Sequence, residues 1–597
     1  MCSTALVPEQ LTADEAVSLI RPGDRVFVGS ACGTPRTLLA ALHRCSPAVP
    51  GVRLVHFLAD GIDQTYPQEV YFVGTALSGH VESGWVDYAP VSSGDLPGLI
   101  ASGQHRVDVA LIQVAPPDEH GMCSLGVSVD VTRAAALAAP VVLAEVNPAM
   151  PRTGPSSTIP MSRITALVQV DEPLSEYVHE PVGEAAARIA PYVARLVPDG
   201  ATLQVGLGRV PHEMLRHLTG RRDLRVHSDA VTDSLIDLLD AGVVRDEPGA
   251  VVASMAVGTK RLFDRLSDPV VDLQPIEAVC ALRTLTRIDR FVSVTQAFAV
   301  DLTGQVCADA DNGVLYGGVA AQPVMHYAAS RSPGGRAVIC LSTEFADGTS
   351  RIRDVLLPAE AVAIPRADVH YVTTEYGTAY LFGRSLRDRA VALIEVAHPR
   401  HRADLLAAAV ARGLVPPEQK LRSRGAYPGG EERTVQLADQ ASVELRPART
   451  GDASLLQDLF YRMPPEDVYT RFFRHLTTLP LSTAEHLTSV SFDEEVTFLA
   501  VVGALEAERV VGTASYYLDR VTGTADVAYM VDPDWKGRGL GRALQTRLVD
   551  YARKVGVRAL TADVLAENTA MLRLFRSTGL ELSAHTTQGV TEVVLTL

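Results

Sequence analysis

Near the end of the chain, the stretch DPDWKGRGLGRAL combines glycines and basic residues in a spacing that suits a phosphate group. Gly537, Gly539 and Gly541 alternate with other residues, and Lys536 and Arg538 lie beside them. Glycines let backbone N–H groups approach an anion closely, and a following helix adds the positive end of its dipole. A strand-to-helix turn without a ligand has the same appearance, so the stretch alone leaves both interpretations open.

A shorter pattern of this kind occurs in TLQVGLGRVP, residues 202–211. A β-branched run leads into Gly206 and Gly208, and a helical pattern follows. In an α/β protein, this order brings the backbone close to a ligand at the carboxyl end of a strand. A single GxG pair is a weak signal by itself.

The elements that must position these residues differ between the two parts of the chain. Residues 1 to about 430 alternate β-branched runs with helical patterns, which predicts parallel sheets covered on both faces, with about five strands in each of two halves. The polar segment 419–439 contains Pro428 beside two glycines and is predicted to be a linker. The runs expected as strands are DRVFVGS, VRLVHFL, DVALIQV, VVLAEV, ALVQV, TLQVGLG, RFVSVTQAF, AVICLS and AVAIP.

After the linker, a further unit begins. VELRPARTGD predicts a strand and a turn, and residues 453–462 predict a helix. FLAVVGA, VVGTASYYL and TADVAYMV predict strands of the antiparallel type, and LGRALQTRLVDYARKVG predicts an amphipathic helix directly after the glycine loop.

The bulk composition limits the class of protein. With 597 residues, the chain has room for three or four domains of roughly 100 to 200 residues. A formal net charge of −16 disfavours nucleic-acid binding, and no run approaches the roughly 18 apolar residues of a membrane span. The seven cysteines form no CxxC pair, which argues against a disulfide framework and a zinc site. From this cysteine pattern we expect no metal. Because no signal peptide is evident, we expect a cytoplasmic protein.

Residues 443–597 resemble the GNAT family of N-acetyltransferases. The family signature is Gln or Arg, two residues, Gly, any residue, and Gly or Ala. Lys536, Gly539 and Gly541 occupy those places, with lysine replacing the first residue. The stretch AENTAMLRLFRSTGLE is similar to the fourth motif of the family, and Asn568 matches an asparagine near the thiol end of CoA.

The resemblance implies an α+β domain with a mixed, mostly antiparallel sheet, in which an amine attacks the thioester of acetyl-CoA. An ammonium has no lone pair, so a base must remove its proton. Asp526 stands where related protein-lysine acetyltransferases carry a glutamate and is the candidate base; the alternative is a solvated strand carboxylate. Phe575 fills the position of a tyrosine that protonates the leaving thiolate in many relatives, so water would take that role. The residues implied to hold the CoA pyrophosphate are Lys536, Gly537, Arg538, Gly539, Leu540 and Gly541.

Four long blocks within residues 5–425 resemble the acetyl-CoA hydrolase and 4-hydroxybutyrate CoA-transferase family. The resemblance implies two open parallel-sheet α/β halves of the NagB/RpiA type, residues 1–195 and 196–430, with acyl-CoA bound between them. It also implies a homodimer and a glutamate nucleophile that forms an anhydride and then a glutamyl-CoA thioester. The blocks are DVALIQVAPPDEHGMCSLGVSVD, AEVNPAMPRT, VDLTGQVCAD and PRADVHYVTTEYGTAYLFGRSLRDRA.

Asp229, in VHSDAVTDSLIDLLDAGVV, fills the position of that glutamate. Aspartate is one methylene shorter, which moves the carboxylate back by roughly an ångström and can cost about a hundredfold in rate. Asp229 therefore suits a general base for thioester hydrolysis better than a nucleophile. The structural alternative is that Asp229 caps a helix over 230–240. Glu375, in a matched block, is either a second catalytic carboxylate or polar scaffolding.

The glycine-rich turn that this family places near the thioester reads YGGVAAQPVMHY here, with Ala320 and Ala321 replacing a pair of glycines. If either position needs a positive φ, alanine costs about 1 to 2 kcal/mol and narrows the pocket. The residues expected to contact acyl-CoA in this front module are Gly206, Gly208, Gly317, Gly318 and Gln322.

Three functions stay open at this point. The first is an acetyltransferase acting on an amine, with protein lysine as the expected acceptor and a front module that binds acyl-CoA and regulates. The second is a bifunctional enzyme whose front module is an active hydrolase or CoA-transferase. The third is a non-catalytic scaffold that senses CoA. Acetyl-CoA or CoA is the expected ligand in each case.

Overall fold

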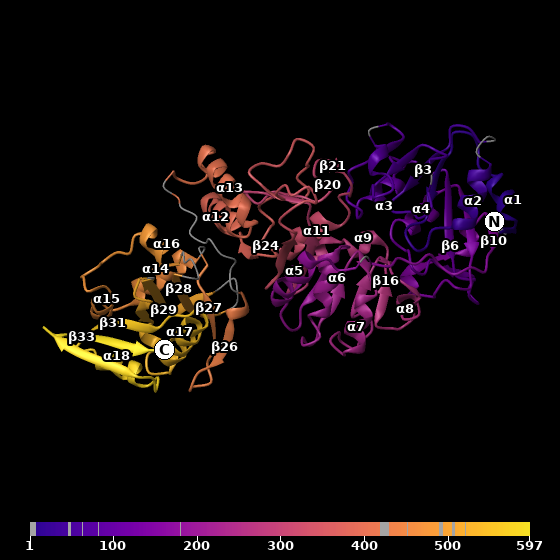
Figure 1. The fold of residues 1–597 in the computed structure, drawn as a ribbon. Helices are drawn as coiled ribbons and strands as arrows, with labels where there is room; N and C mark the ends of the chain where they lie inside the picture. Colours follow the sequence, from indigo (N-terminus) through magenta and orange to yellow (C-terminus); the bar gives the residue numbers. More distant parts are fainter. Residues whose placement is uncertain are drawn as a thin grey trace. The chain divides into compact units, whose positions relative to one another are not determined.

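The computed structural model describes the chain except for residues 1–7, 46–48, 63, 82, 180, 418, 420–428, 450–451, 489–493, 504–507 and 520. The chain folds as two compact units, Met1–Arg389 and Ala390–Leu597 (Figure 1). The division falls within helix α12 (Leu386–Glu395), which is followed by α13 (Pro399–Ala411). The compact units thus divide at an earlier residue than the domain boundary expected near 430.

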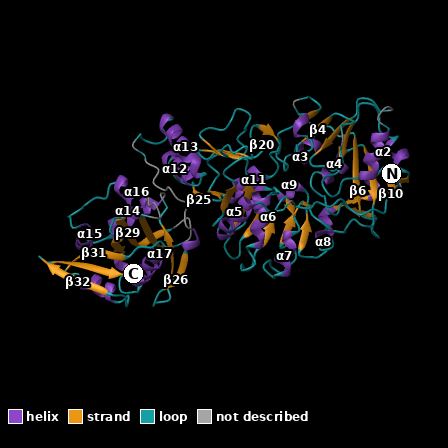
Figure 2. Cartoon of the chain, viewed as in Figure 1, coloured by secondary structure: helices purple, strands orange, loops and turns teal. Residues whose placement is uncertain are grey.

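The first half of Met1–Arg389 is built on an eight-stranded sheet in which all neighbouring strands are parallel. Every residue of β6 is buried, as expected when helices cover both faces of a parallel sheet (Figure 2). In spatial order, the strands are β1 (Glu9–Gln10), β10 (Ala166–Gln169), β8 (Val141–Val146), β6 (Val109–Val114), β2 (Arg25–Val28), β3 (Arg53–His56), β4 (Gln68–Val70) and β5 (Val86–Tyr88). The longer helices are α1 (Ala13–Val17), α2 (Arg36–Arg44), α3 (Leu96–Ala101) and α4 (Thr132–Ala138).

The second half has a similar sheet, parallel except for its last pair of strands. Its strands are β16 (Val271–Leu273), β14 (Val251–Ala253), β12 (Arg225–His227), β11 (Thr202–Val205), β17 (Phe291–Gln296), β22 (Arg336–Cys340), β24 (Tyr371–Thr374) and β25 (Gly377–Tyr380). Its longer helices are α5 (Glu184–Arg195), α6 (Arg209–Arg216), α7 (Ser234–Asp240) and α11 (Gln322–Ala329). The open α/β halves expected from the sequence are therefore confirmed, with eight strands each rather than about five.

Backbone hydrogen bonds join these two halves to each other at several places. They fix the mutual position of the segments around the glycine turn and the strand β15 (Met255–Ala256). The donor and acceptor pairs include Val73 with Gly317 at 3.0 Å, Ser93 with Ala320 at 3.0 Å, Val129 with Ser254 at 3.1 Å and Ala256 with Val127 at 2.8 Å.

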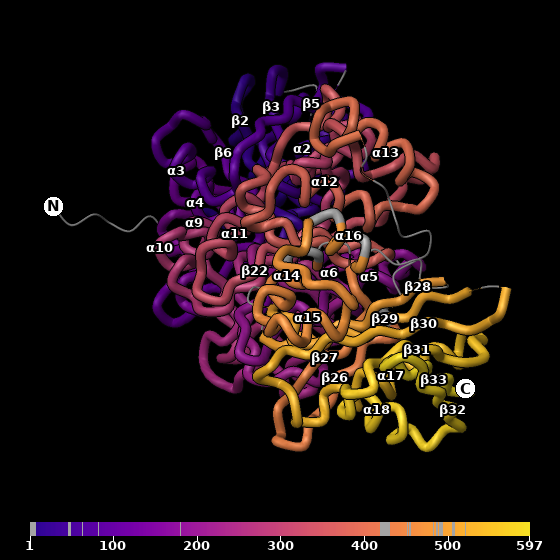
Figure 3. The backbone as a smooth tube through the Cα atoms, turned by 90° about the vertical axis from the view of Figure 1, so that its left-hand side faces the viewer, coloured from indigo at the N-terminus to yellow at the C-terminus, as the bar shows by residue number. Residues whose placement is uncertain are grey.

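The unit Ala390–Leu597 contains a mixed, mostly antiparallel eight-stranded sheet, as expected. Only β30 and β31 run parallel. Figure 3 shows β28, β29, β30 and β31 following one another across this sheet. In spatial order, the strands are β26 (Arg433–Gln436), β27 (Ser442–Pro447), β28 (Glu495–Val502), β29 (Arg509–Asp519), β30 (Thr524–Val531), β31 (Ala559–Leu565), β33 (Val590–Thr596) and β32 (Leu582–Thr587). The helices are α14 (Ala453–Arg462), α15 (Pro465–Phe472), α16 (Leu481–Thr488), α17 (Leu540–Lys554) and α18 (Thr569–Arg576).

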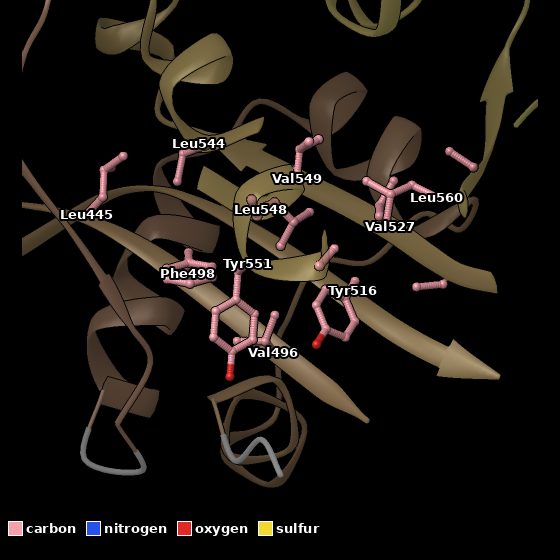
Figure 4. Packing of buried hydrophobic residues seen from close by; sticks show 14 of the residues in the cluster. Leu445, Val496, Phe498, Tyr516, Val527, Leu544, Leu548, Val549, Tyr551 and Leu560 are labelled. Atoms are coloured by element: carbon pink, nitrogen blue, oxygen red, sulfur yellow. The ribbon is translucent and has the colours of Figure 1, made fainter. Parts of the chain in front are cut away.

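Helix α17 covers one face of this sheet. Its apolar residues Leu544, Leu548 and Tyr551 pack against side chains of the antiparallel strands, with the rings of Phe498 and Tyr551 5.5 Å apart (Figure 4). This core holds the glycine loop rigidly, because α17 begins at the end of that loop.

Three sequence-based interpretations need correction. AVAIP, residues 361–365, is not a strand; it contributes only an isolated bridge from Ile364 to Val306. The helix expected over 230–240 begins at Ser234, because Ala230–Val231 form the short strand β13. In the segment expected as a linker, Arg433–Gln436 form β26 at the edge of the sheet.

Candidate functional site

Asp229 lies just beyond the carboxyl end of β12, a central strand of the second parallel sheet. Ligands of open α/β sheets bind at this end of the strands. Its side chain is half-buried, with Gln204 Nε2 3.5 Å and Ser228 Oγ 3.3 Å from Oδ1. Its backbone carbonyl accepts hydrogen bonds from Ser254 and Met255, both at 3.1 Å. Gln204 of β11 and the adjacent Ser228 therefore hold the carboxylate, while Ser254 and Met255 hold the backbone of Asp229.

A chain of buried polar groups continues from Gln204 into the core. The Ser293 hydroxyl donates to Gln204 Oε1 at 2.7 Å and lies 2.8 Å from Nδ1 of His326. The Ser293 hydroxyl therefore links the Gln204 amide to the imidazole ring of His326. Burial lowers the pKa of His326 to about 3, so the ring is neutral. The chain fixes the amide of Gln204 so that its nitrogen faces Asp229.

The electrostatics at Asp229 suit a base. Burial raises the pKa of its carboxyl, and its hydrogen bonds oppose this only in part. Asp229 does not cap α7, whose N-cap is Asp233, so the structural alternative is wrong.

Glu375 accepts hydrogen bonds from the backbone and hydroxyl of Thr343, the hydroxyl bond being 2.5 Å long, and this favours the scaffolding interpretation.

The first half of the unit approaches this region at Gly94. A Cβ atom at Gly94 would lie 2.6 Å from Cys280 Cβ, so only glycine fits. Burial, followed by the charge of Asp229, raises the pKa of the Cys280 thiol. The first half therefore contributes Gly94 to the region that contains Cys280, whose thiol feels the charge of Asp229.

One of the two alanines in the glycine turn has the positive φ that would strain an alanine. Ala320 has a φ of 49°, a left-handed conformation, whereas Ala321 is the N-cap of α11 with a φ of −92°. Ala320 is buried, and its carbonyl accepts the hydrogen bond from Ser93. The first alanine of the pair is thus the strained one.

We expect Ala320→Gly to raise the free energy of unfolding by about 1 kcal/mol, because relief of left-handed strain exceeds the entropy cost of glycine. Thermal unfolding of the full chain measures this. The matched control is Ala321→Gly, which removes no strain and should be neutral or destabilising. A lower melting temperature for Ala320→Gly than for the wild type would contradict the expectation.

The other glycines expected to bind acyl-CoA in this module each pack closely against protein atoms. A Cβ atom at Gly318 would lie 2.5 Å from the carbonyl of Tyr71, and one at Gly208 would lie 2.8 Å from Gln296 Oε1. The corresponding distances are 3.0 Å at Gly317, to Ala308, and 3.3 Å at Gly206, to Val294. Packing therefore explains these glycines without a ligand. Gln322 differs, because its buried Oε1 has no hydrogen-bond partner in the described part of the chain.

The glycine loop of the C-terminal unit is open, in contrast. Gly537 and Gly539 have φ values of 75° and 91°, and nothing lies within 4 Å of a Cβ atom built at either residue. Gly539 is the N-cap of α17 and presents the first N–H groups of this 15-residue helix. Lys536 pairs with Asp467 of α15, and Arg538 Nη1 lies 3.1 Å from Asp439. Open backbone and flanking cations together suit an anionic ligand.

Two further residues of the predicted CoA site have structural roles. The Leu540 side chain lies in the core, so only its backbone faces the loop. Asn568 is the N-cap of α18, and its Oδ1 accepts from Met571 N–H at 3.1 Å. The cap engages the amide oxygen of Asn568 and orients its amide nitrogen.

Asp526 lies on β30 where this strand separates from β31. The pairing of the two strands ends at Asp526 and Thr561, although β30 continues to Val531 and β31 to Leu565. Partial burial of the carboxyl, reinforced by the charge of Asp563, raises the pKa of Asp526, and Arg471 opposes this. A carboxylate of raised pKa at an opening in the sheet fits the base expected from the sequence.

Sequence reasoning missed Tyr529, which lies on the same strand. Its ring packs against Phe575 with centroids 6.3 Å apart, and its buried hydroxyl has no hydrogen-bond partner among the described residues. The only sequence signal is the single aromatic residue in the strand segment ADVAYMV.

Candidate metal sites and membrane-spanning helices are both absent from the described residues. No group of three or more His, Cys, Asp or Glu side chains is arranged to hold a metal ion. Within the same residues, none of the helices combines the length and apolarity needed to cross a membrane.

Comparison with known proteins matches three regions of the chain. Residues 8–178 match the acetyl-CoA hydrolase/transferase N-terminal domain, residues 258–409 match the acetyl-CoA hydrolase/transferase C-terminal domain, and residues 458–580 match the acetyltransferase (GNAT) family. The match over residues 258–409 contains the glycine turn. The match over residues 458–580 contains Asp526, the glycine loop and Asn568.

Individual proteins are similar to this chain over the same regions. The 4-hydroxybutyrate coenzyme A transferase of Clostridium kluyveri is 37% identical over 411 residues, which cover 66% of this chain and 96% of that protein. The crystal structure of RipA from Yersinia pestis has a TM-score of 0.63 at 30% identity, covering 68% of this chain and 98% of RipA. The acetyltransferase Pat of Mycolicibacterium smegmatis is 29% identical over 146 residues, 24% of this chain and 43% of Pat. The chain therefore belongs to the acetyl-CoA hydrolase/transferase family, carries a GNAT acetyltransferase domain after that module, and is an acyl-CoA-dependent enzyme with acyltransferase activity.

Proposed function

We propose that the GNAT domain transfers the acetyl group of acetyl-CoA to the side-chain amine of protein lysines, with Asp526 as the base. The observation that carries the proposal is the opening of the sheet between β30 and β31 at Asp526. The open loop at Gly537 and Gly539 supports binding of the CoA pyrophosphate at the other end of the same strand. An amine at the opening would lie beside a carboxylate that remains in contact with solvent.

The surface around the opening favours a cationic acceptor. Asp563 stands opposite Glu592 on β33, and both are exposed. With Asp526, they form a group of carboxylates that attracts a lysine ammonium before its deprotonation. The overall charge of −16 adds to this attraction. A small amine would gain less from such a surface than a lysine on a basic protein.

For the front module, we propose that it binds acyl-CoA near Asp229 and hydrolyses the thioester, with Asp229 activating water. By consuming the same acyl-CoA, the module would regulate the supply for acetyl transfer. The short side chain of Asp229 and the strained Ala320 argue against efficient covalent CoA transfer. We further propose a homodimer formed through this module, as the family resemblance implies, and a cytoplasmic location.

The glycine loop provides a direct test of the CoA site. We expect Gly539→Val to raise the KM for acetyl-CoA about tenfold to a hundredfold, because a side chain there blocks charge-assisted backbone hydrogen bonds worth roughly 1.5–3 kcal/mol. The assay is acetyl transfer to a lysine-rich protein, which reports on this domain alone.

The matched control is Gly579→Val. Gly579 also has a positive φ, 70°, and open space around its Cβ position, but it lies beyond α18 and outside the loop. This variant carries the same kind of strain and should keep its KM. Equal KM values for the wild type and Gly539→Val would refute CoA binding at the loop.

A further inference from the structure

Three polar side chains lie in a row inside the second parallel sheet, behind Asp229. Gln204 of β11 and Ser293 of β17 are partners in the register of these neighbouring strands, so their side chains lie on the same face. His326 belongs to α11, the helix that packs on β17. All three residues are 0% exposed. Since apolar side chains could fill the places of Ser293 and His326 with little loss of stability, packing alone does not explain the row.

One end of the row meets the candidate site. The Ser293 hydroxyl donates to Gln204 Oε1 at 2.7 Å, so the amide turns its nitrogen the other way, 3.5 Å from Asp229 Oδ1. An inverted amide would turn its oxygen to the carboxylate, and the two acceptors would repel each other. His326 Nδ1 lies 2.8 Å from the Ser293 hydroxyl and restricts its position. Asp229 is half-buried, so it is the one of these four side chains that solvent reaches.

We propose that Ser293 and His326 are positioning residues for Asp229, because together they hold the Gln204 amide in the orientation that donates to the carboxylate. The inference rests on the thioester hydrolysis proposed above. The hydrogen bonds from Gln204 and Ser228 both end on Oδ1 of Asp229, which assigns Oδ2 to the attacking water. As the water oxygen bonds to the thioester carbon, Oδ2 takes the water proton while Oδ1 stays held.

The charge on Asp229 depends on the same contact. Burial raises the pKa of its carboxyl, and the hydrogen bond from Gln204 lowers it. The Cys280 thiol is coupled to Asp229, and the carboxylates of Asp95 and Glu277 act on that thiol in turn. These titratable groups stay the same in the variants below, so a change in the pKa of Asp229 can be traced to Gln204.

The test measures release of the CoA thiol from acetyl-CoA by the full chain as a function of pH, with the rate of Asp229→Asn subtracted. Ser293→Ala frees the Gln204 amide to invert, and the charged carboxylate loses its donor. We expect the acidic limb of kcat to move to higher pH by about half a unit to one unit. The plateau of kcat should fall about tenfold, with the KM for acetyl-CoA within about twofold of the wild type.

Gln204→Met removes the amide itself and should move the limb in the same direction. Adding Ser293→Ala to Gln204→Met should move it no further, because Ser293 acts through Gln204. The matched control is Thr373→Val, which removes another fully buried hydroxyl from the same sheet, one that lies 3.1 Å from the Thr378 hydroxyl. This control also loses a buried hydrogen bond but should keep the pH profile of the wild type.

An unmoved limb in folded Ser293→Ala would overturn the inference, and so would additive shifts in the double variant or an equal shift in Thr373→Val. If Ser293→Ala does not fold, His326→Phe, which keeps a ring of similar size, should give a smaller shift in the same direction, and no shift would count against the inference. A wild-type chain that releases no thiol beyond Asp229→Asn would refute the proposed hydrolysis together with this role. Hydrolysis with an unmoved limb would refute only the role of Ser293 and His326.

Discussion

Asp526→Asn is expected to lower acetyl transfer to lysine-rich proteins by about 10²- to 10⁴-fold, the usual contribution of a positioned general base. Asparagine keeps the size of the side chain but cannot accept the ammonium proton. Because Asp526 is in contact with solvent, the substitution should leave the melting temperature nearly unchanged. Steady-state rates with intact, folded chains measure the effect. A variant that keeps more than half of the wild-type rate would exclude Asp526 as the base.

The pH dependence of the same reaction gives an independent check. The rate should fall as the pH drops through the pKa of Asp526, because the protonated carboxyl cannot act as a base. Since burial and Asp563 raise this pKa, the acidic limb should lie above the range of an ordinary aspartate. Asp563→Asn is the matched control: removing its negative charge makes Asp526 easier to ionise, so the limb should move to lower pH, while the plateau measured with saturating lysine-rich protein is largely kept.

Asp229→Glu is expected to increase CoA transfer between carboxylates about a hundredfold, because the added methylene restores roughly an ångström of reach towards the thioester. The assay supplies acetyl-CoA and propionate and measures propionyl-CoA. Thioester hydrolysis should decrease in the same variant, since the longer side chain occupies the space of the attacking water. Gln204 and Ser228, which surround the carboxylate, are unchanged by the substitution.

Asp229→Asn separates this effect from changes in binding. It should abolish both hydrolysis and transfer while leaving acetyl-CoA binding to the module intact. If Asp229→Glu gains no transfer, the strained turn at Ala320 becomes the remaining obstacle, and Asp229→Glu combined with Ala320→Gly tests it. Failure of that double variant as well would show that Asp229 does not occupy the position of a nucleophile.

Much of the fold follows from local patterns. The helix Ala453–Arg462 and the strand Thr524–Val531 are predicted at the bounds that the structure has. Sequence patterns predict too few strands in the parallel sheets, because strands such as β4 (Gln68–Val70) and β12 (Arg225–His227) contain only three residues. So short a run has no recognisable period, and it becomes a strand only when neighbours supply hydrogen bonds on both sides.

The candidate sites are less accessible to prediction than the fold. The positive φ of Ala320 occurs where its carbonyl accepts a hydrogen bond from Ser93 of the other half, a contact that no local pattern reveals. The hydroxyl of Tyr529 attracts attention only when its surroundings are known, since a tyrosine in a strand is otherwise ordinary. In both cases, the decisive contact joins residues far apart in the chain.

The edge strand β26 has a practical consequence for anyone who wishes to express the acetyltransferase by itself. Glu431, just before this strand, binds Arg547 and Lys554 of α17, so the N-terminal approach to the domain is anchored to its central helix. A fragment that starts at Ser442 would lose this anchor and leave the outer side of β27 without its hydrogen-bonding neighbour. Such bare strands invite aggregation, and a usable fragment should therefore begin before Gly429.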